Sequence, residues 1–219
     1  MTRRFLTALA LLALTAAVSA GLVHAQGQPG AERPPYRIDL HAGWSLISFP
    51  GDPVDGTPEN VMGDSQVEVV WAHQGHQWKA AVRAADGSWR TATGLTTILG
   101  GWGYWVYTPA ATTIETALSP DTPRPSPEGC GWQLMGIWDA EQQPAGTKVD
   151  ADDYFAGVGW REAYGFLSEA NLWTKVVTGT DGTVEVGRGY WVRVTLGGWH
   201  AVDSSGTFCP FDRAEGLTW

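Results

Sequence analysis

The chain has 219 residues, of which 13 are Trp and 28 are Gly, and its 14 Lys plus Arg against 23 Asp plus Glu give a formal net charge of −9. Such an acidic chain lacks the basic face that nucleic acid and anionic lipid require, so neither is expected as a partner. Charged residues make up only 17% of the chain, which excludes a disordered acidic tail. The many aromatic residues and Gly turns favour an exported protein rich in β-structure.

The N-terminus has the pattern of a secretory signal peptide. Two arginines precede an apolar stretch over 5–18, and small residues then permit cleavage after Ala20 or after Ala25. We favour Ala25, which makes 1–25 the signal peptide and 26–35 a flexible segment. A membrane anchor is the weaker alternative, because a spanning helix needs roughly 20 apolar residues. The mature protein is therefore expected to be secreted or exposed on the cell envelope, with no membrane span after cleavage.

An internal repeat is the strongest signal after the leader. The segment 43–49 (GWSLISF) returns as 131–137 (GWQLMGI), and the pattern Gly-x-Gly-Tyr-Trp-Val occurs at 101–106 and again at 187–192. The two offsets, 88 and 86 residues, are nearly equal, which chance rarely produces. The predicted units are copy one over 36–118, copy two over 129–209 and a C-terminal tail over 210–219.

A proline-rich segment over 119–128 separates the two copies. Four prolines within nine residues favour a stiff, extended linker over a helix or a central strand. The alternative is a loop that packs onto one continuous domain, and the sequence leaves both readings open.

Copy one has the alternating apolar patterns of strands and one helix signal. Thr57 is the expected N-cap of a short helix, with Pro58 at its first position. The pair Asp86-Gly87 predicts a type I′ hairpin turn. The expected strands are 44–49, 67–73, 77–83, 88–93, the segment around 104–106, and 112–118.

Copy two repeats this plan. Asp150 is the expected N-cap of its helix, and Asp152 and Asp153 would lie near the positive end of the helix dipole. The same three carboxylates could bind Ca²⁺, but helix capping explains them more simply. The expected strands are 162–167, 172–178, the segment around 190–192, and 199–203. The predicted fold is therefore mainly β, with two pseudo-symmetric small antiparallel modules that each contain one short helix.

Cys130 and Cys209 are the two cysteines of the chain. In an oxidising compartment a lone pair most simply forms one disulfide, which here would join the two ends of copy two. Two free buried thiols are the alternative.

The repeat motifs resemble a Trp-rich repeat of large exported bacterial and archaeal surface proteins, which opens with Gly-Trp-Asn-Leu-Ile-Ser-aliphatic-Pro and closes with Gly-x-Gly-Tyr-Trp-Val. The close matches are 43–50, Val70-Trp71 with Trp78, and 101–106; the looser ones are 131–137, Trp173 and 187–192. Copy two lacks the Pro and has Tyr164 where Trp71 aligns. The resemblance implies an extracellular or cell-envelope module and implies no catalytic residue.

The tryptophans are the main candidates for binding. Trp44, Trp105, Trp132 and Trp191 occupy motif positions and are expected in the core. The less constrained indoles are the candidate ligand-binding residues, because exposed indole faces stack on sugar rings; core packing is the alternative. They are Trp71, Trp78, Trp89, Trp160, Trp173 and Trp199.

No motif for catalysis or metal binding stands out. The chain lacks Gly-x-Ser-x-Gly, His-Glu-x-x-His and a Gly-rich phosphate loop. His73 and His76 could offer two imidazoles, but a zinc site needs three or four ligands. No catalytic residue, metal site or cofactor is therefore expected.

The function expected from the sequence is an exported, non-catalytic interaction or cell-envelope module, with surface glycans or other envelope proteins as partners. A carbohydrate-binding module that uses exposed Trp is the first alternative, and a row of coplanar exposed indoles would favour it. A small extracellular hydrolase is the second, because the spacing of a carboxylate pair is set by the fold.

Overall fold

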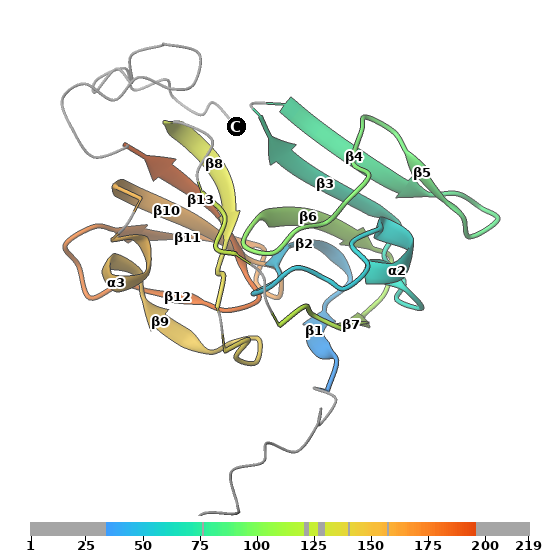
Figure 1. The fold of residues 1–219 in the computed structure, drawn as a ribbon, viewed down its shortest axis with the longest axis horizontal. Coiled ribbons are helices and arrows are strands. Elements are labelled where there is room, and N and C mark those ends of the chain that lie inside the picture. Colours follow the sequence, from blue (N-terminus) through green and yellow to red (C-terminus); the bar gives the residue numbers. More distant parts are fainter. Residues whose placement is uncertain are drawn as a thin grey trace, which may run out of the picture. The chain divides into compact units, whose positions relative to one another are not determined.

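The computed structural model describes residues 34–75, 77–120, 123–126, 130–139, 141–156 and 158–195, which lie in one compact unit. The predicted signal peptide, Trp199 and Cys209 lie outside the described residues, so the predicted Cys130–Cys209 disulfide stays a prediction. The described chain is mainly β, as predicted, with several antiparallel sheets and two short helices (Figure 1).

Copy one forms a five-stranded sheet with the strand order β2-β6-β3-β4-β5 and a separate two-stranded sheet in which β1 pairs with β7. Its elements are β1 (Tyr36–Leu40), β2 (Gly43–Ser48), α2 (Pro58–Met62), β3 (Val69–Gln74), β4 (Gln77–Arg83), β5 (Trp89–Thr91), β6 (Gly103–Thr108) and β7 (Thr112–Thr116).

Copy two forms a four-stranded sheet with the order β11-β10-β13-β8 and a two-stranded sheet of β12 and β9. Its elements are β8 (Gly131–Gly136), β9 (Lys148–Asp150), α3 (Ala151–Phe155), β10 (Trp160–Leu167), β11 (Leu172–Val177), β12 (Thr183–Glu185) and β13 (Gly189–Val194). Strands β8, β13, β10 and β11 thus follow the order of β2, β6, β3 and β4.

Both predicted helix starts are confirmed. The Thr57 hydroxyl accepts a hydrogen bond from the Asn60 amide at 3.4 Å, and Pro58 is the first residue of α2. Asp150 Oδ1 accepts from the Asp153 amide at 3.0 Å at the start of α3. Each side chain satisfies an amide that a helix of one turn leaves without a carbonyl partner.

The predicted type I′ turn at Asp86-Gly87 is wrong. A type I′ turn needs a positive φ at both central residues, and of these two only Gly87 has one, +85°. The Gly87 amide donates to Ala84 O and the Ala84 amide donates to Ser88 O, which is a three-residue loop that ends in a left-handed Gly. Asp86 Oδ1 accepts from both the Ser88 amide and the Ser88 hydroxyl, which favours this longer turn.

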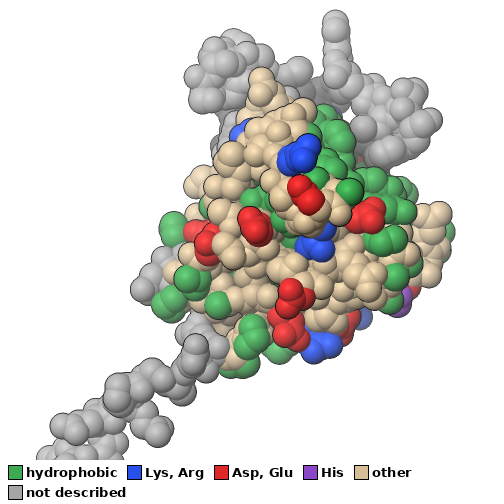
Figure 2. All heavy atoms as spheres, turned by 90° about the vertical axis from the view of Figure 1, so that its right-hand side faces the viewer, with side chains coloured by type: hydrophobic (Ala, Val, Ile, Leu, Met, Phe, Trp, Pro, Cys, Tyr) green, Lys and Arg blue, Asp and Glu red, His purple; other side chains and the backbone are tan. Residues whose placement is uncertain are grey.

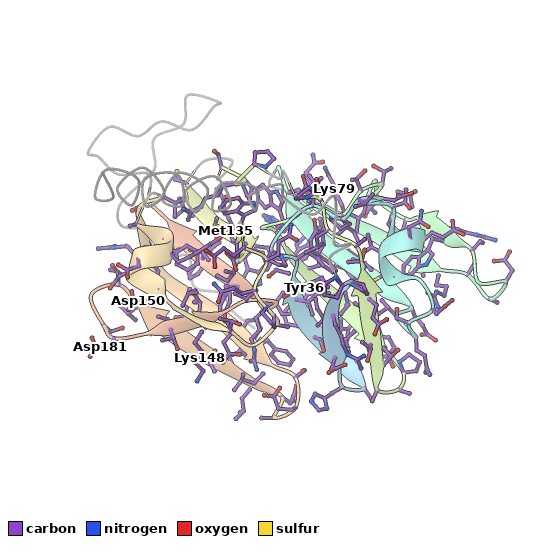
Figure 3. All side chains as sticks on the ribbon, turned by 60° about the horizontal axis from the view of Figure 1, so that its bottom comes forward. Tyr36, Lys79, Met135, Lys148, Asp150 and Asp181 are labelled. Atoms are coloured by element: carbon purple, nitrogen blue, oxygen red, sulfur yellow. The ribbon has the colours of Figure 1, made fainter. Side chains whose placement is uncertain are left out.

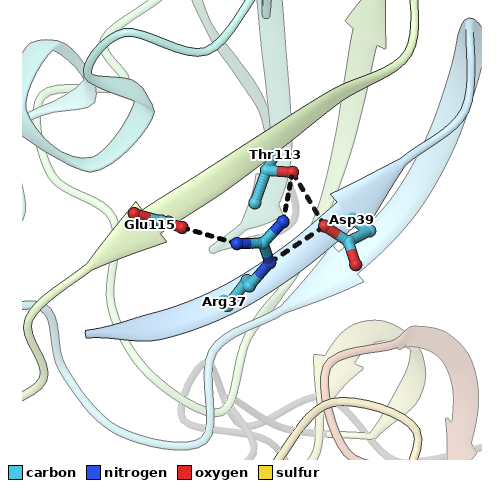
Figure 4. Close-up of polar contacts among 4 residues, drawn as sticks. All are labelled: Arg37, Asp39, Thr113 and Glu115. Atoms are coloured by element: carbon cyan, nitrogen blue, oxygen red, sulfur yellow. Dashed lines mark hydrogen bonds and ion pairs between the residues drawn. The ribbon is translucent and has the colours of Figure 1, made fainter. Parts of the chain in front are cut away.

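Three short strands, β1, β9 and β12, were not predicted from the sequence. Strand β1 alternates buried and exposed residues along its length. On its exposed side, Arg37 binds Asp39 at 3.2 Å and Glu115 of β7 at 2.9 Å, and the Thr113 hydroxyl donates to Asp39 at 2.7 Å (Figure 4). Exposed ion pairs contribute little to the stability of a fold. Their main effect here is to favour the observed register between β1 and β7.

A buried tyrosine stabilises the same turn in each copy. Tyr104 OH accepts from the Leu99 amide at 2.8 Å, and Tyr190 OH accepts from the Glu185 amide at 2.8 Å. Both tyrosines belong to Gly-x-Gly-Tyr-Trp-Val, and both amides lie five residues earlier. Burial raises the pKa of Tyr190 to about 12, so its hydroxyl stays protonated at physiological pH.

The two copies pack directly against each other. The Ser48 amide donates to Gly187 O at 2.9 Å, and the Gly136 amide donates to Gly101 O at 2.8 Å. Ser48 and Gly136 occupy the same repeat position, as do Gly187 and Gly101, so the two hydrogen bonds are equivalent. The bridges Ile47–Arg188 and Met135–Trp102 form a second equivalent pair, and Figure 3 shows Met135 near the middle of the described unit.

The described part of the Pro-rich segment packs onto this unit. The Arg124 guanidinium lies 4.7 Å from the centre of the Tyr154 ring and donates to Tyr154 O. A side chain at Gly101 would lie 2.3 Å from Pro125 Cγ. Residues 123–126 therefore contact both copies, as expected of a packed loop.

Glycines permit the close approach of the two sheets. A Cβ at Gly103 would lie 2.9 Å from Leu134 Cγ, and one at Gly189 would lie 2.8 Å from Ile47 O. A Cβ at Gly136 would lie 2.1 Å from Ser48 Cβ and 2.9 Å from a backbone oxygen. These distances exclude any side chain unless the copies separate.

The substitution Gly136→Ala should lower the free energy of unfolding by about 1–3 kcal/mol, because the added methyl group overpacks the contact with Ser48. Guanidinium denaturation of the mature chain would measure it. The exposed change Thr96→Ala, the control, should stay within about 0.5 kcal/mol of the unsubstituted chain. Equal stability of both variants would show that the copies do not meet as closely as described.

Candidate functional site

The motif tryptophans lie on the face of each sheet that meets the other copy. Directly opposed residues point to the same side of a sheet, and Leu46, Trp105 and Trp71 are opposed across β2, β6 and β3. Leu134, Trp191 and Tyr164 are opposed in the same way in copy two. The leucines are buried, whereas the indoles extend past the area that the other copy covers.

The prediction that the motif tryptophans are core residues is therefore wrong for Trp44, which is 43% exposed, and only partly right for Trp105, Trp132 and Trp191, which are partly buried. The physical reason is which residues make the closest contact between the copies. Close packing is confined to the glycines and leucines, and the indoles line the margins of that contact. Tyr104, Phe49 and Phe155 are the aromatic side chains that are fully buried in the described core.

Five aromatic side chains from both copies form one continuous group, which we call cluster A. Trp44 lies 5.3 Å from Tyr107 and 6.4 Å from Trp105, measured between ring centroids. Trp105 lies 5.2 Å from Phe166 and 5.6 Å from Trp173, which belong to copy two. Trp173 is 39% exposed, so cluster A presents an indole from each copy to solvent.

A second group, cluster B, occupies the other margin of the contact between the copies. Trp191 of copy two lies 5.3 Å from His73 and 5.7 Å from Trp78 of copy one, and Trp78 lies 6.0 Å from Trp71. Trp78 is 46% exposed. Repeat positions relate the two clusters: Trp191 corresponds to Trp105, His73 to Phe166 and Trp78 to Trp173. In each cluster, the central strand of one copy packs on the hairpin end of the other.

The rings in both clusters meet edge to face or at a tilt and do not form a row. Within cluster A the angles between ring planes run from 54° to 82°. In cluster B, Trp71 and Trp78 meet at 79° and Trp78 and Trp191 at 71°. Aromatic pairs prefer this geometry for packing. A flat platform for successive sugar rings would need parallel planes, which neither cluster provides.

A third group, the polar patch, lies on the sheet of copy two around Trp132 and Tyr164, whose rings are 5.6 Å apart. Glu162 binds Lys175 at 2.6 Å and Arg193 at 3.6 Å, and the Tyr164 hydroxyl donates to Glu162 at 3.3 Å. The Lys175 ammonium lies 5.2 Å from the centre of the Tyr164 ring. The equivalent positions of copy one hold Trp44, Trp71, Val69, Ala80 and Tyr107, so the fold does not require these charges.

Neighbouring cationic groups favour the ionised form of the Glu162 carboxyl group. Partial burial of its carboxyl raises the pKa, but the hydrogen bond and charge of Lys175, the Tyr164 hydroxyl and the charge of Arg193 outweigh it and lower the pKa below its ordinary value. The resolved shifts of Asp39, Asp55, Asp86 and Glu169 are also downward. A general acid needs the opposite shift, and none of these five carboxyl groups has it.

The remaining candidate tryptophans do not join the clusters. Trp160 is buried, with 7% of its surface exposed, and packs on Phe155 at 5.2 Å, so it is a core residue and not a ligand-binding one. Trp89 is half-buried beside the Arg83 guanidinium, 5.2 Å from the ring centre. On the face that carries β4, β5 and α2, hydrophobic side chains are interrupted by acidic and basic ones (Figure 2).

The acidic residues at α3 have structural partners. Besides the cap formed by Asp150, Asp152 accepts from the Thr178 hydroxyl at 2.8 Å and from the Gly179 amide at 2.7 Å. These bonds join α3 to the end of β11. Within the described residues, no group of three or more His, Cys, Asp or Glu side chains is placed to hold a metal ion, and His76 lies outside them.

No described helix combines the length and the apolar character that crossing a membrane requires. No protein-family model matches the chain, and no match was found among the curated proteins or the solved structures. The evidence for the candidate sites is therefore the geometry of this chain.

Replacing Trp105 with Ala should destabilise the chain by about 3 kcal/mol, since the indole joins β6 of copy one to two rings of copy two. Replacing Trp89, a partly buried indole that packs beside Arg83 of its own copy, should cost clearly less. Thermal unfolding monitored by circular dichroism would compare the two variants. A cost at Trp105 no larger than at Trp89 would contradict a stabilising role for cluster A.

Glu162 should titrate below an ordinary glutamate, and Lys175→Met should raise its pKa, because the ammonium group no longer favours the carboxylate. A lowered folded-state pKa stabilises the fold fully above the ordinary carboxyl pKa, and this contribution is lost as the pH falls through the folded-state value. Carbon-detected NMR titration of the carboxyl group would measure both pKa values. An unchanged pKa in Lys175→Met would contradict the ion pair.

Proposed function

We propose that the mature chain is an exported, non-catalytic interaction module that binds a protein of the cell envelope through cluster A. The observation that carries this proposal is the exposure of Trp44 and Trp173, about two fifths each, at the two ends of one continuous aromatic group. Trp105 and Phe166 lie between them and hold both indoles in place.

This arrangement has the physical character of a protein-binding site. Interface energy concentrates in a few aromatic and Arg side chains, and Trp is the most enriched of them. An indole that is already packed by neighbouring rings loses little side-chain entropy on binding. Tyr107 and Trp105 supply that packing for Trp44, so a partner's apolar side chains would find a preformed surface.

Export and pairing of the cysteines belong to the same proposal. The N-terminal pattern of residues 1–25 and the resemblance to repeats of exported surface proteins support secretion. An oxidising compartment would in turn permit the Cys130–Cys209 bond. The common strand order and the equivalent hydrogen bonds of Ser48 and Gly136 support an approximate twofold relation between the copies.

A saccharide is the second candidate ligand, and the polar patch is the observation that favours it. Trp132 and Tyr164 offer apolar ring surfaces beside Glu162, Lys175 and Arg193. Sugar hydroxyls both donate and accept hydrogen bonds, so a carboxylate next to two cations matches them. The edge-to-face rings of cluster A lack this polar setting.

Equivalent tryptophans of the two copies make a matched test of the two candidates. Trp44→Ala should weaken binding of the labelled mature chain to the envelope fraction of the encoding organism by about 30-fold, the loss of about 2 kcal/mol that a central interface Trp carries. Trp132→Ala, its counterpart, should change binding less than about threefold. Titration followed by fluorescence anisotropy would give both affinities.

Two results would overturn the assignment to cluster A. If Trp132→Ala weakened binding and Trp44→Ala did not, and free oligosaccharides competed, the polar patch would be the binding site. If both variants bound as the unsubstituted chain does, neither site would carry the interaction.

A further inference from the structure

The last strand of the copy-two sheet lacks a neighbour that its counterpart in copy one possesses. In copy one, β5 covers β4, with Ala81 opposite Thr91 and Arg83 opposite Trp89. In copy two, only 178–182 connect β11 to β12, and all of these residues are described. They form no strand, and Thr180 and Gly182 stay close to Val177 and Val176 at the end of β11. In the strand order of the described chain, β11 is an edge of the four-stranded sheet.

The backbone of β11 offers the same groups that β5 uses on β4. In copy one, the outward carbonyl of Ala80 accepts from the Ala92 amide at 2.9 Å, while the Arg83 amide donates inward to Glu68. In copy two, the Thr178 amide donates inward to Arg161 at 3.0 Å. Backbone groups alternate in direction along an antiparallel strand. Lys175 and Val177, the counterparts of Ala80 and Val82, therefore direct their amides and carbonyls outward. The Val177 carbonyl already accepts a hydrogen bond from the Thr180 hydroxyl at 2.6 Å, and a carbonyl oxygen can accept a second one.

The side chains of β11 do not protect this edge. Proteins often guard an edge strand with Pro or with a Lys that projects from it. Here Lys175 is folded back onto its own sheet, bound to Glu162 at 2.6 Å above Tyr164. Three of the seven exposed large hydrophobic side chains of the described residues, Leu172, Trp173 and Val177, lie on this one strand. The edge is thus apolar and has no Pro.

We propose that β11 pairs antiparallel with β11 of a second chain, which joins two four-stranded sheets into one. The sequence of β11 is self-complementary in this arrangement. With Val176 opposite Val176 of the second chain, Lys175 of each chain lies opposite Val177 of the other, which avoids two facing ammonium groups. A β-branched pair is favourable across antiparallel strands. On each chain, the outward amides of Lys175 and Val177 and the carbonyl of Lys175 gain partners, and the Val177 carbonyl accepts a second donor beside Thr180.

The predicted dimer is reversible. Two six-residue strands bury less surface than a standard interface, so the dimer should form at about micromolar concentrations or above. Cluster A is not required for this pairing through Lys175 and Val177, and the dimer does not depend on the proposed function.

Sedimentation velocity of the mature chain over about a hundredfold range of concentration should show a monomer–dimer equilibrium. Lys175→Pro removes an outward amide and leaves the inward ladder of β11 intact, so its dissociation constant should rise at least tenfold. Lys175→Ala keeps the amide and should dimerise like the unsubstituted chain. Circular dichroism would confirm that both variants are folded.

Hydrogen exchange gives an independent measurement on the unsubstituted chain. The amides of Lys175 and Val177 should exchange more slowly as the concentration rises, and those of Arg90 and Thr91 on β5 should not change. An unsubstituted chain that stays monomeric throughout would overturn the proposal. A Lys175→Pro dimer as stable as that of Lys175→Ala would overturn it as well, and Trp44→Ala, which leaves β11 untouched, should dimerise normally.

Discussion

The close approach of the two sheets at glycine is the constraint on which the remaining structure depends. Leu134 packs against Gly103, and Leu46 and the carbonyl of Ile47 pack against Gly189. Each Gly precedes the Tyr-Trp pair of its own copy, so the residue that permits the contact also positions the indole beside it. One face of each sheet packs within its own copy. Part of the opposite face is buried against the other copy.

The exposed aromatic surface follows from this constraint. Because close packing is limited to small residues and leucines at the centre, the larger rings are held at the margins, where they contact the other copy and still reach solvent. Cluster A and cluster B are thus two outcomes of one packing arrangement. The two clusters differ in composition, with Phe166 in one and His73 in the other, and copy two carries charged residues around Trp132. The copies thus differ more in these surface residues than in the hydrogen bonds at their contact.

Local patterns predicted most of the fold. Alternation located the longer strands, and the capping residues Thr57 and Asp150 located both helices, because each signal depends on neighbours in sequence. The exposure of Trp44 could not be predicted in this way, since it depends on how copy two packs against the sheet of copy one. The type I′ prediction at Asp86-Gly87 is wrong because the hydrogen bonds from Ser88 to the Asp86 carboxylate favour a three-residue turn over a two-residue one. In copy two, the segment between β11 and the Gly-x-Gly-Tyr-Trp-Val motif is shorter than the matching segment of copy one, and the sequence shows this. That β11 is therefore an edge strand follows only once the strand order is known.

The most direct test of this account is a measurement of ring contacts between the copies. A nuclear Overhauser spectrum of the mature chain, with selectively labelled aromatic residues, should show cross-peaks from Trp105 to Phe166 and from Trp191 to Trp78, because both pairs lie within 6 Å between ring centroids. Cross-peaks confined to rings of the same copy would contradict the interlocked arrangement and with it the origin of both clusters.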